Sequence, residues 1–305
     1  MPPSSEFRAV LHLGSPLVWL PLAAAMLFAL GAILLRRAAA GRIDSWRVTF
    51  LSNQLTTLVF LPLLMLGGEP LRLENSWQPL MVAVLFIAGQ MTTVLALTHG
   101  EVSVAAPVMG LKIVLVAVFS FLLFQKPLPA EIWLACALAT VGVALLNVSG
   151  SRSGGRAGFS ALLAFAAAAA FGLFDVCVQA WSPNWGIGRF LPCVFGMSSL
   201  LSLGFIPFFK DRLLAIPMDA RWWLLGGCGL IAAQSLCIVS TVAVWGHAAE
   251  ANVIYSTRGV WSVIFVWFLG RLLGDIDPGM TGRTLGFRLA GAMLLLSAVT
   301  LLLMG

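Results

Sequence analysis

The chain has 305 residues, of which 60% are hydrophobic and only 10% are charged, and its net charge is +6. Soluble domains carry about 25% charged residues, so this composition excludes an ordinary soluble protein and is typical of a chain folded within a lipid bilayer. The cations stand at the ends of apolar segments rather than in one basic run, which does not favour a nucleic-acid partner.

A helix that crosses a bilayer needs about 20 mostly apolar residues. Ten segments of the chain meet that need. We therefore predict an all-α integral membrane protein with ten transmembrane helices, at about 16–35, 46–67, 78–98, 101–124, 130–148, 157–181, 188–209, 222–245, 250–273 and 284–304. The first segment is too long for the apolar part of a signal peptide, and we interpret it as a membrane helix.

The fourth and ninth segments are related by a constant shift of 149 positions. The shift places Glu101 on Glu250 and, further along the chain, Gly142 on Gly291, with no gap in between. A correspondence over more than forty residues indicates that one unit is written twice. Internal repeats of this kind are found in many secondary transporters.

A Gly- and Ser-rich linker at 149–156 divides the chain at the expected repeat boundary. We predict a first five-helix repeat over 1–150 and a second over 151–305. Because five is odd, two tandem copies must enter the membrane in opposite orientations, which makes this an inverted repeat. The loop cations, counted by the positive-inside rule, place both termini outside.

Each of the two related segments carries one cation among apolar residues, Lys112 and Arg258. A charge at the bilayer centre costs at least about 2.5–3.5 kcal/mol on insertion scales, so something must offset it. We expect both cations to reach one central cavity and to hold an anionic group of a substrate. The alternative is a buried ion pair with Asp175 of the sixth helix. Asp175 is then either that partner or a proton-coupling carboxylate.

Four more residues are candidates for substrate binding in this cavity. Tyr255, the single tyrosine, lies one turn before Arg258, and Trp261 lies one turn after it. Gln90 and Gln234 occupy similar contexts in the third and eighth helices, where they either line the cavity or bond across helices.

Two glutamates and two histidines stand at helix edges. Glu101 and Glu250 begin their helices, where an acidic side chain meets the positive end of the helix dipole. We interpret both, together with the neighbouring His99 and His247, as helix-end residues.

Motifs of enzymes are missing from the sequence. It holds no GxSxG, HExxH or phosphate loop and no Cys/His spacing typical of a metal site. We predict no catalytic residue, cofactor or metal, and we interpret the five cysteines as packing residues. The rival from another class is a membrane-embedded transferase acting on a lipid-linked substrate. It would need a metal among the interfacial acids, which are Glu69, Glu74, Asp275 and Asp277.

Helices 4–5 and 9–10 carry a recurring pattern: a helix with proline or small residues, a short turn, and a glycine-containing helix. Its residues are Pro107, Gly110, Gln125, Lys126 and Gly142 in the first half and Arg258, Gly259, Gly274, Asp275 and Gly291 in the second. The pattern resembles the drug/metabolite transporter superfamily, in its EamA-like family. The family's Gly-Glu turn is replaced by Gln-Lys in the first half and by Gly-Asp in the second.

The resemblance implies a secondary transporter of the bacterial cytoplasmic (inner) membrane, with both termini in the cytoplasm, contrary to the loop charges. Related sugar-phosphate translocators hold phosphate with basic residues on the helices equivalent to 4 and 9, a placement similar to that of Lys112 and Arg258. Other relatives export neutral amino acids or drugs, which remains the alternative. We predict alternating-access transport of a small polar metabolite with an anionic group, by a monomer or homodimer whose other partner is the bilayer.

Overall fold

The computed structural model describes residues 15–40, 43–69, 73–147, 156–213, 215–273 and 282–304. All regular structure in these ranges is helical. The first part of the chain forms α2 (Pro16–Ala40), α3 (Ser45–Phe60), η1 (Leu61–Leu66), η2 (Leu73–Asn75), α4 (Trp77–Thr98), α5 (Val102–Met109), α6 (Lys112–Phe124) and α7 (Ala130–Leu146). The second part forms α8 (Ala157–Trp185), α9 (Ile187–Ser202), η3 (Leu203–Phe208), α10 (Met218–Trp245), α11 (Ala248–Tyr255), α12 (Arg258–Leu273) and α13 (Gly282–Met304).

Some predicted features lie outside the described residues. These are the boundary between 150 and 151, nearly all of the linker, and the turn with Gly274, Asp275 and Asp277.

Eight helical segments of the described chain are long and apolar enough to cross a bilayer. They confirm the all-helical membrane fold. The remaining two predicted spans do not reach that length: α7 is an apolar helix of 17 residues, and the ninth predicted helix is divided into α11 and α12. The structure therefore supports eight spans by length and composition, fewer than the ten predicted from the sequence.

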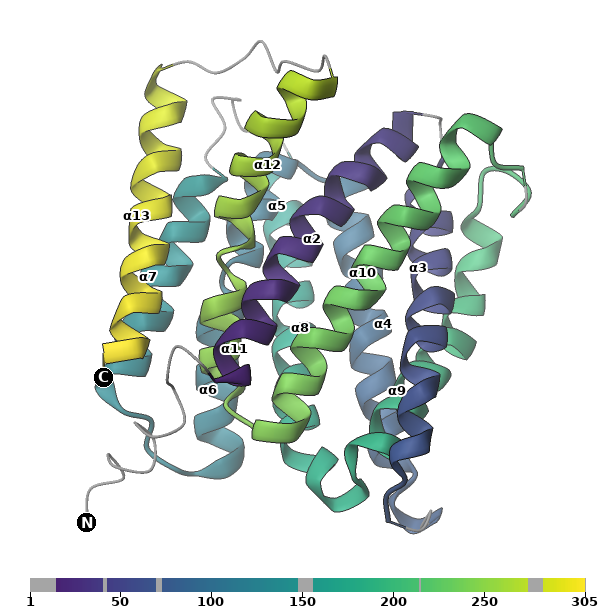
Figure 1. Cartoon of the computed structure of the whole chain (residues 1–305), viewed down its shortest axis with the longest axis vertical. Coiled ribbons are helices and arrows are strands. Elements are labelled where there is room, and N and C mark those ends of the chain that lie inside the picture. Colours follow the sequence, from purple (N-terminus) through teal and green to yellow (C-terminus); the bar gives the residue numbers. More distant parts are fainter. Residues whose placement is uncertain are drawn as a thin grey trace.

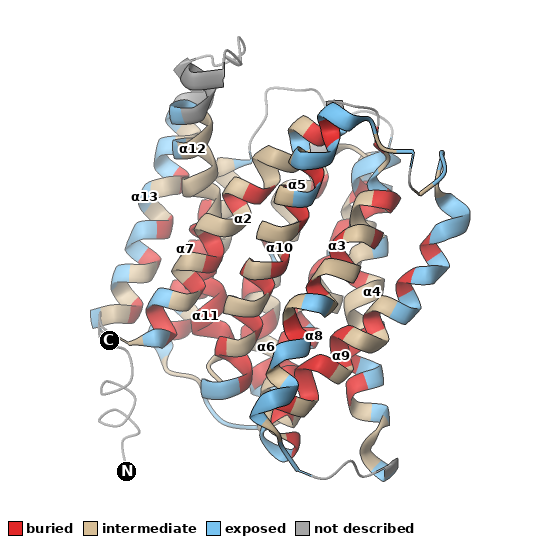
Figure 2. Cartoon of the chain, turned by 45° about the vertical axis from the view of Figure 1, so that its right-hand side comes forward, coloured by how far each residue is buried: buried red, intermediate tan, exposed pale blue. Residues whose placement is uncertain are grey.

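The helices stand side by side along one common direction (Figure 1). α2 begins and α13 ends at the same end of the bundle, which we call the terminal face. Buried residues follow the inward sides of the helices, while exposed residues gather on the outside and at the ends (Figure 2). Many exposed side chains are large and apolar, among them Leu122, Leu200 and Trp222, as lipid contact requires.

Two helices predicted as continuous are broken in the structure. Between α5 and α6, the Gly110 amide donates to the Pro107 carbonyl at 3.0 Å, three residues back instead of four. Between α11 and α12, the hydroxyls of Ser256 and Thr257 each donate to the carbonyl three residues before. Hydroxyl side chains compete with amides for helix carbonyls, which gives the second break a local cause. Pro107, which lacks an amide donor, lies in the last turn of α5 before the first break.

Packing of the two parts follows a reciprocal pattern. α2 packs along α10 as α8 packs along α4, and α12 packs on α2 as α6 packs on α8. α7 and α13 pack on each other. At their crossing, a Cβ added to Gly142 would lie 2.9 Å from the Gly291 carbonyl oxygen, and one added to Gly291 would lie 2.7 Å from the Gly142 carbonyl oxygen. Only glycine at both positions permits this approach.

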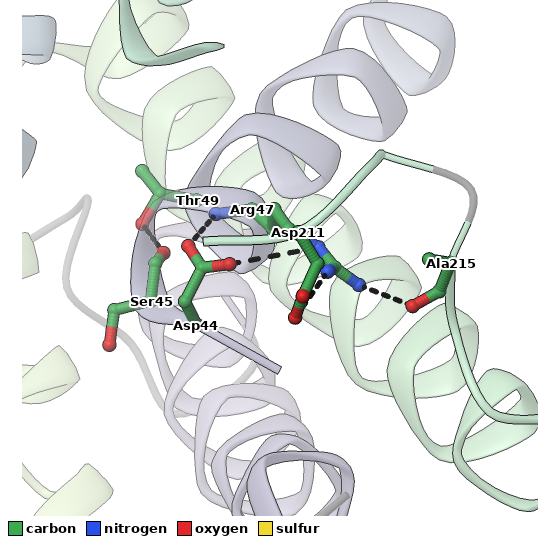
Figure 3. A network of polar contacts seen from close by, with 6 residues as sticks. All are labelled: Asp44, Ser45, Arg47, Thr49, Asp211 and Ala215. Atoms are coloured by element: carbon green, nitrogen blue, oxygen red, sulfur yellow. Dashed lines mark hydrogen bonds and ion pairs between the residues drawn. The ribbon is translucent and has the colours of Figure 1, made fainter. Parts of the chain in front are cut away.

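A buried arginine ties the two parts together at the face opposite the terminal face. Arg47, in the first turn of α3, is only 1% exposed. Its Nη2 donates to the Ala215 carbonyl at 3.0 Å, and its Nη1 lies 3.5 Å from Asp211 Oδ2 (Figure 3). Asp44 caps α3 by accepting from the Arg47 amide at 3.0 Å. Arg47 was not among the candidate residues that the sequence suggested.

A backbone contact joins the two parts at the terminal face. The Glu69 amide, after η1, donates to the Trp185 carbonyl at the end of α8 at 3.0 Å. A Cβ on Gly68 would lie 2.5 Å from that same carbonyl oxygen, so the approach again depends on glycine. At both ends of the bundle, therefore, a contact joins the first part of the chain to the second part.

Candidate functional site

The first-half cation lies in an ion pair. Lys112, the first residue of α6, places Nζ 2.8 Å from Oδ2 of Asp175 on α8. The same oxygen accepts from Nδ2 of Asn252 on α11 at 2.7 Å. Asp175 is 5% exposed, so its charge is compensated inside the protein. This geometry favours the partner role for Asp175 over the proton-coupling role.

The second-half cation has different surroundings. Arg258, the first residue of α12, holds its guanidinium carbon 4.6 Å from the ring centre of Phe28 and 4.7 Å from that of Tyr255. Aromatic faces of this kind stabilise a cation by about 0.5–2 kcal/mol. No carboxylate within the described ranges forms an ion pair with Arg258.

Arg258 lines a pocket of about 370 Å³ together with Arg36 of α2 and Arg288 of α13. We call it the arginine pocket. Its other polar side chains are Asn147, Ser256 and Ser262. Its described lining holds three guanidinium groups and no acidic residue, so its electrostatic potential suits an anion.

The two cations, which were expected to share one cavity, have different partners in the structure. Lys112 is not among the residues that line the arginine pocket, because Asp175 holds its ammonium group on the side of α8. Instead of Lys112, the pocket brings Arg36 and Arg288 beside Arg258, and neither was a candidate from the sequence. A signal existed: Arg36 lies about two turns after Phe28, on the same face of α2.

The other predicted binding residues are distributed through the bundle. Tyr255 is 7% exposed and contributes its ring to Arg258. Gln90 exchanges two hydrogen bonds of 2.8 Å with Asn53 of α3, so it bonds across helices. Trp261 packs near Phe265, at 5.7 Å between ring centres, outside the arginine pocket.

Gln234 of α10, another predicted binding residue, is buried in the bundle. Its Nε2 donates to Ser235 at 2.9 Å. Its Oε1 is buried and accepts no hydrogen bond within the described part of the chain. Gln234 therefore keeps one unused acceptor on α10.

A larger cavity, of about 800 Å³, opens at the terminal face, where α6, α8 and α10 end and α7 and α11 begin. We call it the terminal vestibule. Its polar lining includes Lys126, Glu131, Gln179, His247 and Glu250. Hydrogen bonding to Glu250 raises the pKa of His247, although burial partly opposes this effect.

Metal ligands do not gather in the described residues, where no three His, Cys, Asp or Glu side chains lie close enough to share an ion. The five cysteines lie in helices as free thiols.

Comparisons with known proteins address the first half and the fold. Residues 15–148 match the sequence model of the EamA-like transporter family. A curated relative is the probable 4-amino-4-deoxy-L-arabinose-phosphoundecaprenol flippase subunit ArnE of Pseudomonas savastanoi pv. phaseolicola. It is 30% identical over 128 residues, which are 42% of this chain and 94% of the relative.

A solved crystal structure, described only as that of a protein, matches nearly the whole chain. Its TM-score is 0.72 at 15% identity, covering 94% of this chain and 97% of the other. At this identity the likeness concerns the fold alone.

Proposed function

The chain belongs to the EamA-like transporter family, and from this premise we propose that it is a secondary transporter for a small polar metabolite with an anionic group. Its apolar helices make it an integral membrane protein. We place it in the bacterial inner membrane, as a monomer or homodimer. Membership of a family of transporters favours this function over that of a membrane-embedded transferase.

The arginine pocket is the observation that carries the proposal. Three guanidinium groups within one small pocket repel each other, and a bound anion offsets that repulsion. Arginine also presents paired donors that match the oxygens of a carboxylate or phosphate. The substrate's anionic group would therefore contact Arg258, with Arg36 and Arg288 completing the site.

The start of α12 adds to this attraction. Arg258 is the first residue of a 16-residue helix, so the positive end of the helix dipole points to the same place as its side chain. Half-helices that begin near the middle of the membrane bind anionic substrate groups in this way. The volume of about 370 Å³ lies at the lower end for small-molecule sites, which fits one metabolite.

We propose that the two cavities take part in alternating access by a ten-helix inverted repeat, with 1–150 and 151–305 as its halves. Three observations support this arrangement: the sequence shift of 149, the reciprocal packing, and a break in both related helices. The arginine pocket lies where α2 and α7 end, and the terminal vestibule lies where α7 begins and α13 ends. Rocking of the halves would open one cavity while it closes the other.

The remaining predicted residues take supporting roles in this proposal. Lys112 and Asp175 would link the two halves, since the pair joins α6 to α8. Tyr255 would orient Arg258, while Gln234 would offer its unused acceptor to a substrate passing between the cavities. Gln90 and Trp261 would pack the surrounding helices.

A second candidate is movement of a lipid-linked phosphate. The relative's name specifies a phosphoundecaprenol flippase subunit, and a phosphate headgroup would suit the same arginines. A water-soluble phosphate ester and a short-chain polyprenyl phosphate distinguish the two cases, because only the second carries a lipid chain.

The test is a thermal-shift ligand screen on purified protein in detergent. The library spans phosphorylated metabolites, organic acids, amino acids, nucleosides, cationic drugs and a polyprenyl phosphate. We expect one anionic class to raise the melting temperature and Arg258→Gln to abolish that rise. Arg212→Gln is the matched control, because it removes an exposed loop arginine that lies outside the pocket.

Two outcomes would overturn the anionic substrate. One is stabilisation by neutral or cationic compounds alone, which would turn the search to amino-acid or drug export. The other is stabilisation by an anion that persists in Arg258→Gln.

A further inference from the structure

Glu250 lies at the start of a helix, as predicted, but it is also buried. It lies in the first turn of α11 and is 3% exposed. Its Oε1 lies 3.0 Å from Nδ1 of His247, whose side chain is 31% exposed towards the terminal vestibule. A buried carboxylate is thus joined to an imidazole that water can reach.

The backbone at His247 indicates that this contact is held in place. His247 adopts a left-handed conformation, with φ at 54°, which side-chain-bearing residues adopt rarely. Gln179 of α8 accepts a hydrogen bond from the Ala248 amide at 3.0 Å and fixes the start of α11. Surrounding structure therefore maintains a backbone conformation that is unfavourable for a residue with a side chain.

We propose that His247 and Glu250 form a proton-binding site, open to the terminal vestibule and separate from the arginine pocket. The bound proton sits between the imidazole and the carboxylate, so the pair is an imidazolium beside a carboxylate. Loss of the proton leaves the Glu250 charge buried without its counter-charge, which is unfavourable. The pair therefore holds its proton to a higher pH than a histidine without a carboxylate partner.

Charged and titratable groups from the elements packed on α11 modulate this site. Among the described residues, the α6–α7 turn supplies Lys126, α7 supplies Glu131 and Cys136, and α8 supplies Asp175 through Asn252. From α2, Leu17 packs on Ile254 of α11. From α13 and α10, Leu302 and Trp245 line the vestibule. Glu131 and Lys126 line the same cavity with opposite charges, so they would act on the bound proton in opposite directions.

A proton fits this pair better than a metal ion. Sodium and other hard cations need several oxygen ligands, and an imidazole nitrogen is a proton acceptor instead. The described residues gather no third acidic or histidine side chain here that could complete a metal site.

α11 connects the proton site to the centre of the bundle. Asn252, on the same helix as Glu250, bonds to Asp175, and α11 leads into the break before Arg258. This step rests on the proposed function. The proton is then the ion whose movement is coupled to transport. A change in the protonation of the pair would move α11, which carries both Glu250 and the Asn252 side chain that bonds to Asp175.

The related segment of the first half provides matched controls. Glu101 lies at the start of α5 and accepts from the Arg156 amide at 3.0 Å. His99 is exposed and contacts Thr98. A histidine two residues before the glutamate does not reproduce the three-residue spacing of His247 and Glu250.

Nuclear magnetic resonance of isotopically labelled histidine tests the site without any substrate, so its result is independent of the ligand screen. The chain has three histidines, and His12→Gln and His99→Gln assign His247 by elimination. We expect the pKa of His247 to lie above the ordinary histidine value of about 6.5, because its carboxylate partner favours the imidazolium. Glu250→Gln should lower that midpoint towards the ordinary value, whereas Glu101→Gln should leave it unchanged.

The proposal is overturned by a wild-type His247 midpoint at or below the ordinary histidine value of about 6.5, a measurement that needs no change to the pair. An unchanged midpoint in Glu250→Gln would also overturn it. Sodium is added in a parallel titration, and a sodium-dependent shift of the midpoint would reassign the pair to a metal ion.

Discussion

Gly142 and Gly291 lie 149 positions apart and meet at one crossing, where each would press an added Cβ onto the carbonyl oxygen of the other. Lys112 and Arg258 lie in segments related by the same shift, yet their surroundings differ. Lys112 is neutralised by Asp175, whereas Arg258 rests between two aromatic rings beside Arg36 and Arg288. The two related segments of the chain therefore match in how their helices pack and differ in where their charged side chains lie.

The largest effect should come from removing the charge that balances Lys112. Asp175→Asn leaves a mostly buried ammonium group unpaired, and breaking a buried pair costs about 3–5 kcal/mol. Lys112→Met combined with Asp175→Asn should recover most of that loss, because neither charge remains. Arg258→Met should cost only about 1 kcal/mol, from its aromatic contacts. Unfolding in detergent measures all three variants, and equal losses in Asp175→Asn and Arg258→Met would remove the contrast.

An intermediate effect is expected at the glycine crossing. Gly142→Ala and Gly291→Ala each force α7 and α13 apart, and overpacking of this kind costs about 1–3 kcal/mol. The two losses should be alike because the contact is reciprocal. Gly196→Ala on α9 is the control, since its added Cβ meets nothing within 4 Å. Thermal melts compare the three, and a harmless Gly291→Ala beside a damaging Gly142→Ala would break the reciprocity.

The smallest effect is a pH dependence at His247. The raised folded-state pKa of His247 means that its stabilising contribution is complete below the unfolded value of about 6.5. This contribution is lost as the pH rises through the folded value. The difference in melting temperature between wild type and His247→Gln should therefore shrink with rising pH, while His99→Gln should follow wild type. A difference that stays constant with pH would contradict the pairing.

Composition and periodicity sufficed for the membrane fold, because apolar length is a local property that the sequence displays directly. The shift of 149 located both segments that the structure breaks. The positions of the breaks were harder to predict. Pro107 is a recognisable signal near the first break, whereas the second has only the hydroxyl residues Ser256 and Thr257. The orientation from loop cations stays a prediction.

The candidate site was only partly visible in the sequence. Lys112, Arg258 and Asp175 stood out because a charge inside an apolar segment is costly. Arg36 and Arg288 did not, since an arginine near a helix end looks like an interfacial cation until the fold brings other arginines beside it. Arg47 was concealed in the same way by its position at the start of α3. Which side chains meet is a tertiary fact, and one sequence without its fold leaves it open.

The ion pair between Lys112 and Asp175 also imposes an order on how the protein is made. Synthesis proceeds from the N-terminus, so the lysine enters the bilayer before its aspartate has left the ribosome. Until α8 arrives, that lysine must stay near the lipid headgroups or in contact with the insertion machinery. The Lys112 charge is therefore balanced only once α8 has been made and has packed on α6.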